Sequence, residues 1–136
     1  TGCTTYPPGG TCDDAYDVTN ETFPFTLTGT FPDHPDVGFS CDDSATNVVW
    51  FHYTADASAM HEIVASTISS NAWVRLVVLD GVGCDPYDAE LDCVTSLTSQ
   101  ANTTVPLAPG DTYLIALFTD GSAFHMVDPT IDIQVQ

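Results

Sequence analysis

The chain has 136 residues, nineteen acidic side chains and one basic side chain, Arg75, so its formal net charge is −18. Binding to nucleic acid or to an anionic membrane requires clustered Lys and Arg, and this composition argues against both partners. Without lysine, the chain has neither a P-loop nor a Schiff-base nucleophile. Hydrophobic residues make up 43% of the sequence, which is enough for one folded domain with a core.

Five cysteines in a chain of this length indicate an oxidising compartment, and the absence of any Cys-x-x-Cys pair favours disulfides over a metal site. Because the sequence begins at Thr1 without an initiator Met, we expect a mature secreted or cell-surface protein, or an excised domain of one. Cys84 and Cys93 flank a short polar loop, and Cys12 and Cys41 each precede two aspartates. We predict these two pairings.

Cys3 is then left over and is a candidate for cross-linking to another subunit. The chief rival arrangement is a Cys3–Cys12 bond.

Apolar residues recur with a period of two in five segments, which predicts strands over 22–30, 47–54, 74–79, 113–118 and 131–135. In the second segment Val49, Phe51 and Tyr53 share one face, and Trp50 and His52 share the other. The third segment is apolar on both faces apart from Arg75.

One stretch, 56–66, has a helical alternative, but the β-rich Ile63 and Val64 favour a strand over 62–67. Turn signals separate these runs, among them Asp80-Gly81 and Pro109-Gly110-Asp111. We therefore predict an all-β fold with at most one short helix: an antiparallel β-sandwich of seven to eight strands, jelly-roll or Ig-like and stapled by disulfides. Residues 1–11 are expected to form an N-terminal extension, and residues 12–136 a single domain.

Several stretches together resemble a known family. The segments NVVWFHYTA, WVRLVVLDGVGC and LAPGDTYLIAL occur in that order, Cys12 begins a Cys-x-x-Ala motif, and Cys41 precedes the Trp50-Phe51 strand. Over residues 12–136 this pattern is similar to the bacterial pre-peptidase C-terminal-like (PPC-type) domain. The resemblance implies a secreted, non-catalytic β-sandwich that binds, targets or aids secretion. Some members bind calcium, and this chain departs from their calcium positions with Trp73 and with Val94-Thr95-Ser96.

The sequence does not predict an enzyme. Its four histidines, His34, His52, His61 and His125, accompany no nucleophile elbow, and His61-Glu62 lacks the second histidine of a zincin helix. His52, midway along a predicted strand, is expected to face solvent or a neighbouring strand.

Sixteen of the nineteen acidic residues are aspartates spread over the loops, which first indicates a solvated acidic surface screened by salt. The sharper hypothesis is a calcium site, since Ca²⁺ takes six to eight oxygen ligands. Three clusters are candidates. The preferred one is Asp80, Asp85, Asp88 and Asp92, and the others are Asp13, Asp14 and Asp17, and Asp42 and Asp43 with Asp33 or Asp36. No cofactor is expected to be required, and diffuse screening is ranked ahead of calcium.

Four aromatic residues are candidates to stack on sugar rings: Trp50, Trp73, Tyr16 and Tyr87. For the two tryptophans, packing inside the sandwich is the simpler interpretation. Asn20 and Asn102 begin glycosylation sequons. We expect an extracellular module for binding, adhesion or targeting, with a polysaccharide or a protein as its partner. Its binding is expected to depend on carbohydrate or on cations. The alternative is a structural subunit that joins copies of itself into a surface fibre by strand addition.

Overall fold

The computed structural model describes residues 8–31, 37–40, 42–45, 48–56, 59–67, 74–84, 88–96, 98, 100–119 and 126–136. Within these ranges the chain is a sandwich of two sheets, and its helical content is a single 3-10 turn, η1 (Cys12–Asp14). No helix among them is long and apolar enough to cross a membrane. The all-β sandwich predicted from the period-two alternation is confirmed.

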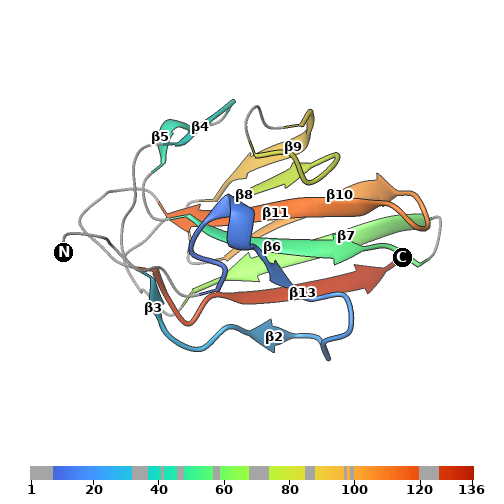
Figure 1. The fold of residues 1–136 in the computed structure, drawn as a ribbon, viewed down its shortest axis with the longest axis horizontal. Helices are drawn as coiled ribbons and strands as arrows, with labels where there is room; N and C mark the ends of the chain where they lie inside the picture. The colour runs from blue at the N-terminus through green and yellow to red at the C-terminus, as the bar shows by residue number, and fades with distance from the viewer. Residues whose placement is uncertain are drawn as a thin grey trace.

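The larger sheet has five strands in the spatial order β1-β6-β11-β8-β9 and the smaller has four in the order β10-β7-β13-β2 (Figure 1). Their neighbours run antiparallel except for β1, which is parallel to β6. The bounds are β1 (Tyr16–Asp17), β6 (Val49–Thr54), β11 (Thr112–Thr119), β8 (Val74–Leu79), β9 (Glu90–Thr95), β10 (Gln100–Leu107), β7 (Ala59–Ser66), β13 (Thr130–Val135) and β2 (Phe25–Thr26).

Two further ladders are short. Strand β3 (Thr30–Phe31) pairs with β12 (Met126–Val127), and β4 (Val37–Phe39) pairs with β5 (Asp42–Ala45). In Figure 1 the β4–β5 ladder lies beside β9. Two hydrogen bonds connect them, because the amide and the hydroxyl of Ser40 both donate to Glu90 Oε1 at 3.1 Å.

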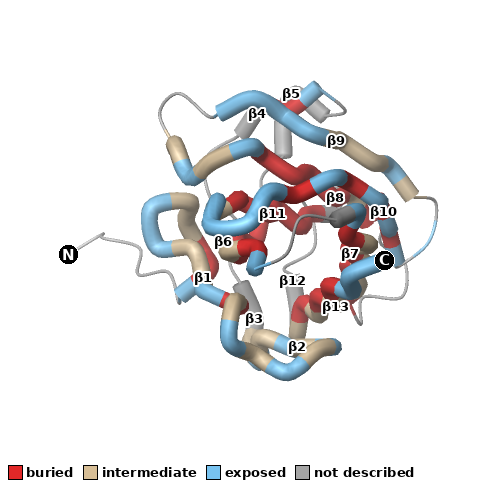
Figure 2. Tube along the Cα trace, turned by 90° about the vertical axis from the view of Figure 1, so that its right-hand side faces the viewer, coloured by how far each residue is buried: buried red, intermediate tan, exposed pale blue. Residues whose placement is uncertain are grey.

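The main core lies between the two sheets. Alternate residues of β6, β7, β8, β10, β11 and β13 point into it, and Figure 2 shows buried positions inside the pair of sheets. The expected face of β6 is confirmed, since Val49, Phe51 and Tyr53 all belong to this core. Facing strand β7 contributes Ile63 and Ala65, so the predicted strand 62–67 is confirmed as far as Ser66, and the helical alternative is wrong.

The opposite face of the larger sheet is also buried and forms a second apolar cluster, called here the outer core. Phe39 of β4 covers it, with its ring centroid 5.9 Å from Trp50 and 5.5 Å from Phe118. The cysteines at 12, 84 and 93 pack against it. The members of the outer core are Phe39, Val48, Trp50, Val77, Leu79, Leu114, Ala116 and Phe118.

Part of this cover is the N-terminal segment, which is hydrogen-bonded to the edge of β6 at both of its ends. The amide of Trp50 donates to the carbonyl of Gly9 at 2.7 Å, and the amide of Val18 donates to the carbonyl of His52 at 3.0 Å. Gly9 has φ +90°, and a Cβ there would lie 2.9 Å from Leu27 Cδ2, so this contact with β6 requires glycine. Between these two anchors, Cys12 and Ala15 pack against the outer core, and the chain then joins the edge of the sheet as β1.

Some strand predictions need correction. The predicted strand 22–30 shrinks to the two residues of β2, although Phe23, Phe25 and Leu27 do pack against the main core as expected. Strands β9 and β10 were not predicted. In β10 every second residue is buried, but the buried set includes Ala101 and Thr103, and the apolar signal is correspondingly weak.

The predicted disulfide pairings are wrong. Cys12 is bonded to Cys84, which lies 72 positions later in the sequence, and the two Cα atoms are 5.8 Å apart. This bond rules out both Cys12–Cys41 and Cys84–Cys93. Cys93 is disulfide-bonded as well, to a cysteine outside the described residues, where Cys3 and Cys41 lie.

Non-reducing peptide mapping of the native protein is expected to yield a Cys12–Cys84 peptide and a Cys41–Cys93 peptide. Cys41 is the expected partner because the preceding residue, Ser40, is hydrogen-bonded to Glu90, and Cys93 lies on the same strand as Glu90. Recovery of a Cys3–Cys93 peptide would contradict the second assignment, and a Cys84–Cys93 peptide would contradict the first.

Candidate functional site

The outer face of the larger sheet is covered at one end and open at the other. On β6 the outward residues run from Trp50, which is 1% exposed, to His52 and Thr54, which are partly exposed. On β11 they run from the buried Phe118 to the partly exposed Thr112. The strands therefore turn from apolar to polar where the cover ends.

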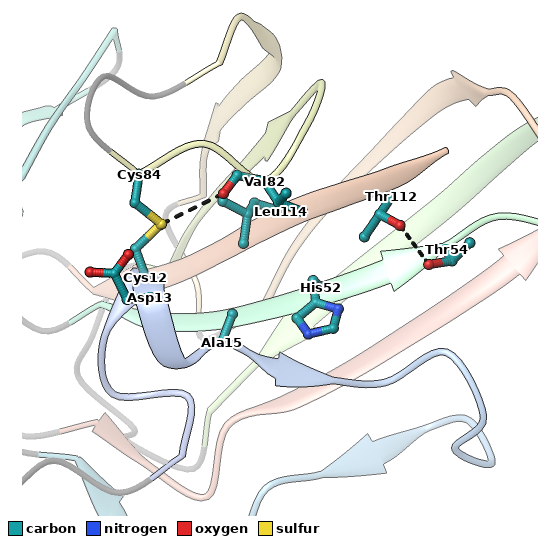
Figure 3. A pocket seen from close by; sticks show the side chains of 9 residues that line it. All are labelled: Cys12, Asp13, Ala15, His52, Thr54, Val82, Cys84, Thr112 and Leu114. Atoms are coloured by element: carbon teal, nitrogen blue, oxygen red, sulfur yellow. Dashed lines mark hydrogen bonds between the residues drawn. A yellow bond between two sulfur atoms is a disulfide. The ribbon is translucent and has the colours of Figure 1, made fainter. Parts of the chain in front are cut away.

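A pocket of about 420 Å³ occupies this open end (Figure 3). Its floor consists of side chains from β6 and β11, and its walls come from the η1 segment on one side and the loop after β8 on the other. The hydroxyls of Thr54 and Thr112 share a hydrogen bond of 2.7 Å across the floor. The lining residues are Cys12, Asp13, Ala15, His52, Thr54, Val82, Cys84, Thr112 and Leu114.

The two walls are fixed to each other and to the sheet. The Cys12–Cys84 disulfide joins them directly. The loop after β8 is held by a bond from the Leu114 amide to the Gly81 carbonyl at 3.0 Å, and by one from the Gly83 amide to Asp88 Oδ2 at 2.8 Å. A pocket between fixed walls loses little conformational entropy when a ligand binds.

At the open end of the pocket His52 faces a carboxylate. His52 Nδ1 lies 3.6 Å from Asp17 Oδ1 on the neighbouring strand β1. Hydrogen bonds from Thr19 hold the pKa of Asp17 below its ordinary value, and His52 adds a smaller lowering effect while partial burial opposes both. The Thr19 amide donates to Asp17 Oδ1 at 2.9 Å, so this carboxylate is held in place beside the imidazole. The expectation that His52 faces solvent and a neighbouring strand is confirmed.

The residues predicted to bind calcium are not gathered into one site within the described part of the chain. Asp85 lies outside it. The carboxylate of Asp88 accepts the bond from Gly83, and that of Asp92 accepts bonds from the Cys93 amide and the Thr103 hydroxyl. No group of three His, Cys, Asp or Glu placed to hold a metal ion occurs among the described residues. Calcium binding stays a prediction.

The two alternative calcium clusters are not gathered into a site among the described residues either. Asp13 and Asp14 are exposed on η1, and Asp17 is engaged with Thr19 and His52. Asp33 and Asp36 lie outside the described residues, and only the backbone of Asp42 and Asp43 is described.

Of the aromatic residues predicted to stack on sugars, Trp50 is unsuited because it is buried in the outer core beneath Phe39. The ring of Tyr16 is partly exposed but stacks on Phe25, with centroids 5.1 Å apart. Trp73 and Tyr87 lie outside the described residues. Neither Trp50 nor Tyr16 lines the pocket.

A second hollow of about 340 Å³ lies near the ends of β10 and β8. It contains Asp80 from the preferred calcium cluster together with Asp111, Tyr113 and the 36%-exposed Leu91. The described lining residues of this hollow supply two carboxylates and include neither cysteine of the Cys12–Cys84 bond. The open pocket is therefore the stronger candidate.

Sequence reasoning did not find this pocket, although a signal was present. The outward positions of β6 change from Trp50 through His52 to Thr54, and those of β11 change from Phe118 through Ala116 and Leu114 to Thr112. Reading each predicted strand for a polarity change along its length would have marked where the cover ends.

No protein-family model matches the chain, and a search of curated protein sequences finds no relative. Solved structures are similar in fold. One is CorA, a surface-associated copper-binding protein of Methylomicrobium album BG8, at 7% identity and a TM-score of 0.58, with 90% of this chain and 98% of that chain covered. Another is the pre-peptidase C-terminal domain of the collagenase from Bacillus anthracis, at 10% identity and a TM-score of 0.50, with 96% and 100% covered. The expected PPC-like fold is confirmed.

Replacing Asp17 with Asn is expected to lower the free energy of unfolding at neutral pH by less than about 1 kcal/mol, because the carboxylate is half exposed and screened. Its pKa is lower in the folded chain than its ordinary 3.8, so its stabilising effect is present above that value and is lost as the pH falls through the lowered pKa. Urea unfolding of both proteins from pH 7 to strong acid measures this, and a difference that grows with acidity would contradict it.

Proposed function

We propose that this protein is a non-catalytic extracellular binding module, and that the open pocket beside the Cys12–Cys84 disulfide binds a carbohydrate. The observation that carries the proposal is the pocket's construction. Hydrogen-bonding side chains stand on rigid paired strands between two walls that are covalently joined. Sites of this kind, with a few convergent polar groups in a preformed hollow, are the usual places for small ligands.

The lining chemistry suits a sugar ring. The imidazole of His52 and the hydroxyls of Thr54 and Thr112 can donate to and accept from sugar hydroxyls. Ala15, Val82 and Leu114 supply apolar surface against which the C–H face of a pyranose can pack.

Two features support a binding role outside the cell rather than catalysis. The Cys12–Cys84 bond is typical of secreted and surface proteins. Among the described lining residues the polar side chains are His52, Thr54, Thr112 and the exposed Asp13, and the two threonine hydroxyls are hydrogen-bonded to each other. The likeness to CorA is one of fold at 7% identity, so its copper binding is not carried over.

The alternative, a fibre subunit that assembles by strand addition, has no specific observation in its favour. At one side of the sandwich the edge strands β1 and β2 are two residues long, and β10 carries Pro106. Short strands and proline are devices that blunt sheet edges.

Replacing His52 with Ala, or Thr112 with Val, is expected to weaken binding of the best ligand in an oligosaccharide panel by about tenfold, because each change removes hydrogen-bonding capacity from the pocket floor. Isothermal titration calorimetry measures the affinities. Thr104→Val is the matched control, since this exposed threonine lies on β10 in the other sheet.

The control variant should bind as the unmodified protein does. Equal losses in Thr104→Val and Thr112→Val, or unchanged affinity in both pocket variants, would contradict the proposed site. Failure of every oligosaccharide to bind would contradict the proposed function.

A further inference from the structure

The negative charge of the protein bears on which sugars the pocket can bind. The protein carries a formal charge of −18 with one basic side chain, Arg75. On β8 Arg75 is paired in register with Phe118, which places it at the covered end of the sheet, away from the pocket. A field of one sign attracts ligands of the opposite charge and repels those of like charge.

Two carboxylates of the described residues lie at the pocket. Asp13 lines it at the disulfide end, and Asp17 lies beside His52 at the open end. Asp14, which is exposed on η1, follows Asp13 in the chain. The titratable group that faces them from the floor is His52.

We propose that the ligand of this pocket is an amino sugar with a free ammonium group, such as a unit of a β-1,4-linked glucosamine polymer. This inference rests on the proposed function and specifies its ligand class. The sugar hydroxyls bind the His52 and Thr112 side chains, and the ammonium group lies against the carboxylate of Asp13 or Asp17. An anionic sugar, such as a uronic acid, is repelled by the same groups.

Calorimetry at mildly acidic pH and low salt tests the proposal with four oligomers of equal length and the same linkage. Their units are glucosamine, N-acetylglucosamine, glucose and glucuronic acid. N-Acetylation keeps the ring and removes the charge, so it isolates the ammonium group. We expect glucosamine to bind most tightly and glucuronic acid not at all, with the preference for glucosamine shrinking as salt is raised.

Two variants separate a local effect from the general field. Asp13→Asn removes one charge at the pocket and is expected to weaken glucosamine binding by about fivefold, a larger loss than for N-acetylglucosamine, which has no ammonium group. Glu62→Gln removes one charge on β7 of the other sheet and is expected to change neither.

The outcomes are distinguishable from those of the proposed function. If neutral and cationic oligomers bind equally, the charge preference is overturned and the binding site stands. If Glu62→Gln weakens binding as much as Asp13→Asn, or if oligolysine displaces glucosamine at equal charge concentration, the attraction is general and the proposal fails. If no oligomer binds, the proposed function fails with it.

Discussion

The larger sheet is apolar on both of its faces, and this constraint organises the rest of the chain. One face packs on the smaller sheet, as in any sandwich. The other, bearing Trp50, Leu114 and Phe118, needs a cover because leaving such side chains in water costs about 1.5–3 kcal/mol each. The N-terminal segment, the β4–β5 ladder and the loop after β8 supply this cover.

The Cys12–Cys84 bond fastens two of these covering segments together. In the chain-entropy model, a bond that closes a loop of this length stabilises the fold by about 4 kcal/mol through the unfolded state. Hydrogen bonds add local anchorage, since Gly9 and Val18 pair with the edge of β6 on either side of η1. The same bond that closes the outer core also makes a wall of the pocket, so stability and the candidate site depend on one covalent link.

The sequence predicts the sheets better than it predicts their cover. The period of two in β6, β8 and β11 predicts these strands and the residues of each face, because it assigns residues to faces without knowledge of the partner strand. Covering segments have no comparable period. Sequence analysis misses strand β10 because its buried positions include the polar Thr103 and the small Ala101, and because Pro106 weakens the strand signal.

The disulfide pairing and the pocket were beyond sequence reasoning for a related reason. Cys84 and Cys93 are close in the chain, but Cys84 ends a loop that reaches η1, and Cys93 lies on β9 opposite Val77. The pocket is lined by His52 and Thr112 from two strands, by Cys12 of η1 and by Val82 of the loop after β8. Only the tertiary arrangement of the sheet brings these four residues together.

Hydroxyl-radical footprinting with mass spectrometry tests the covered outer face most directly. In the disulfide-intact protein, Trp50 is expected to resist oxidation while Met60, which is 45% exposed on β7, is oxidised rapidly. In the Cys12→Ala, Cys84→Ala double variant, Trp50 is expected to become reactive while Phe51 on the opposite face of the same strand stays protected. Oxidation of Trp50 in the intact protein at the rate of Met60 would contradict the account.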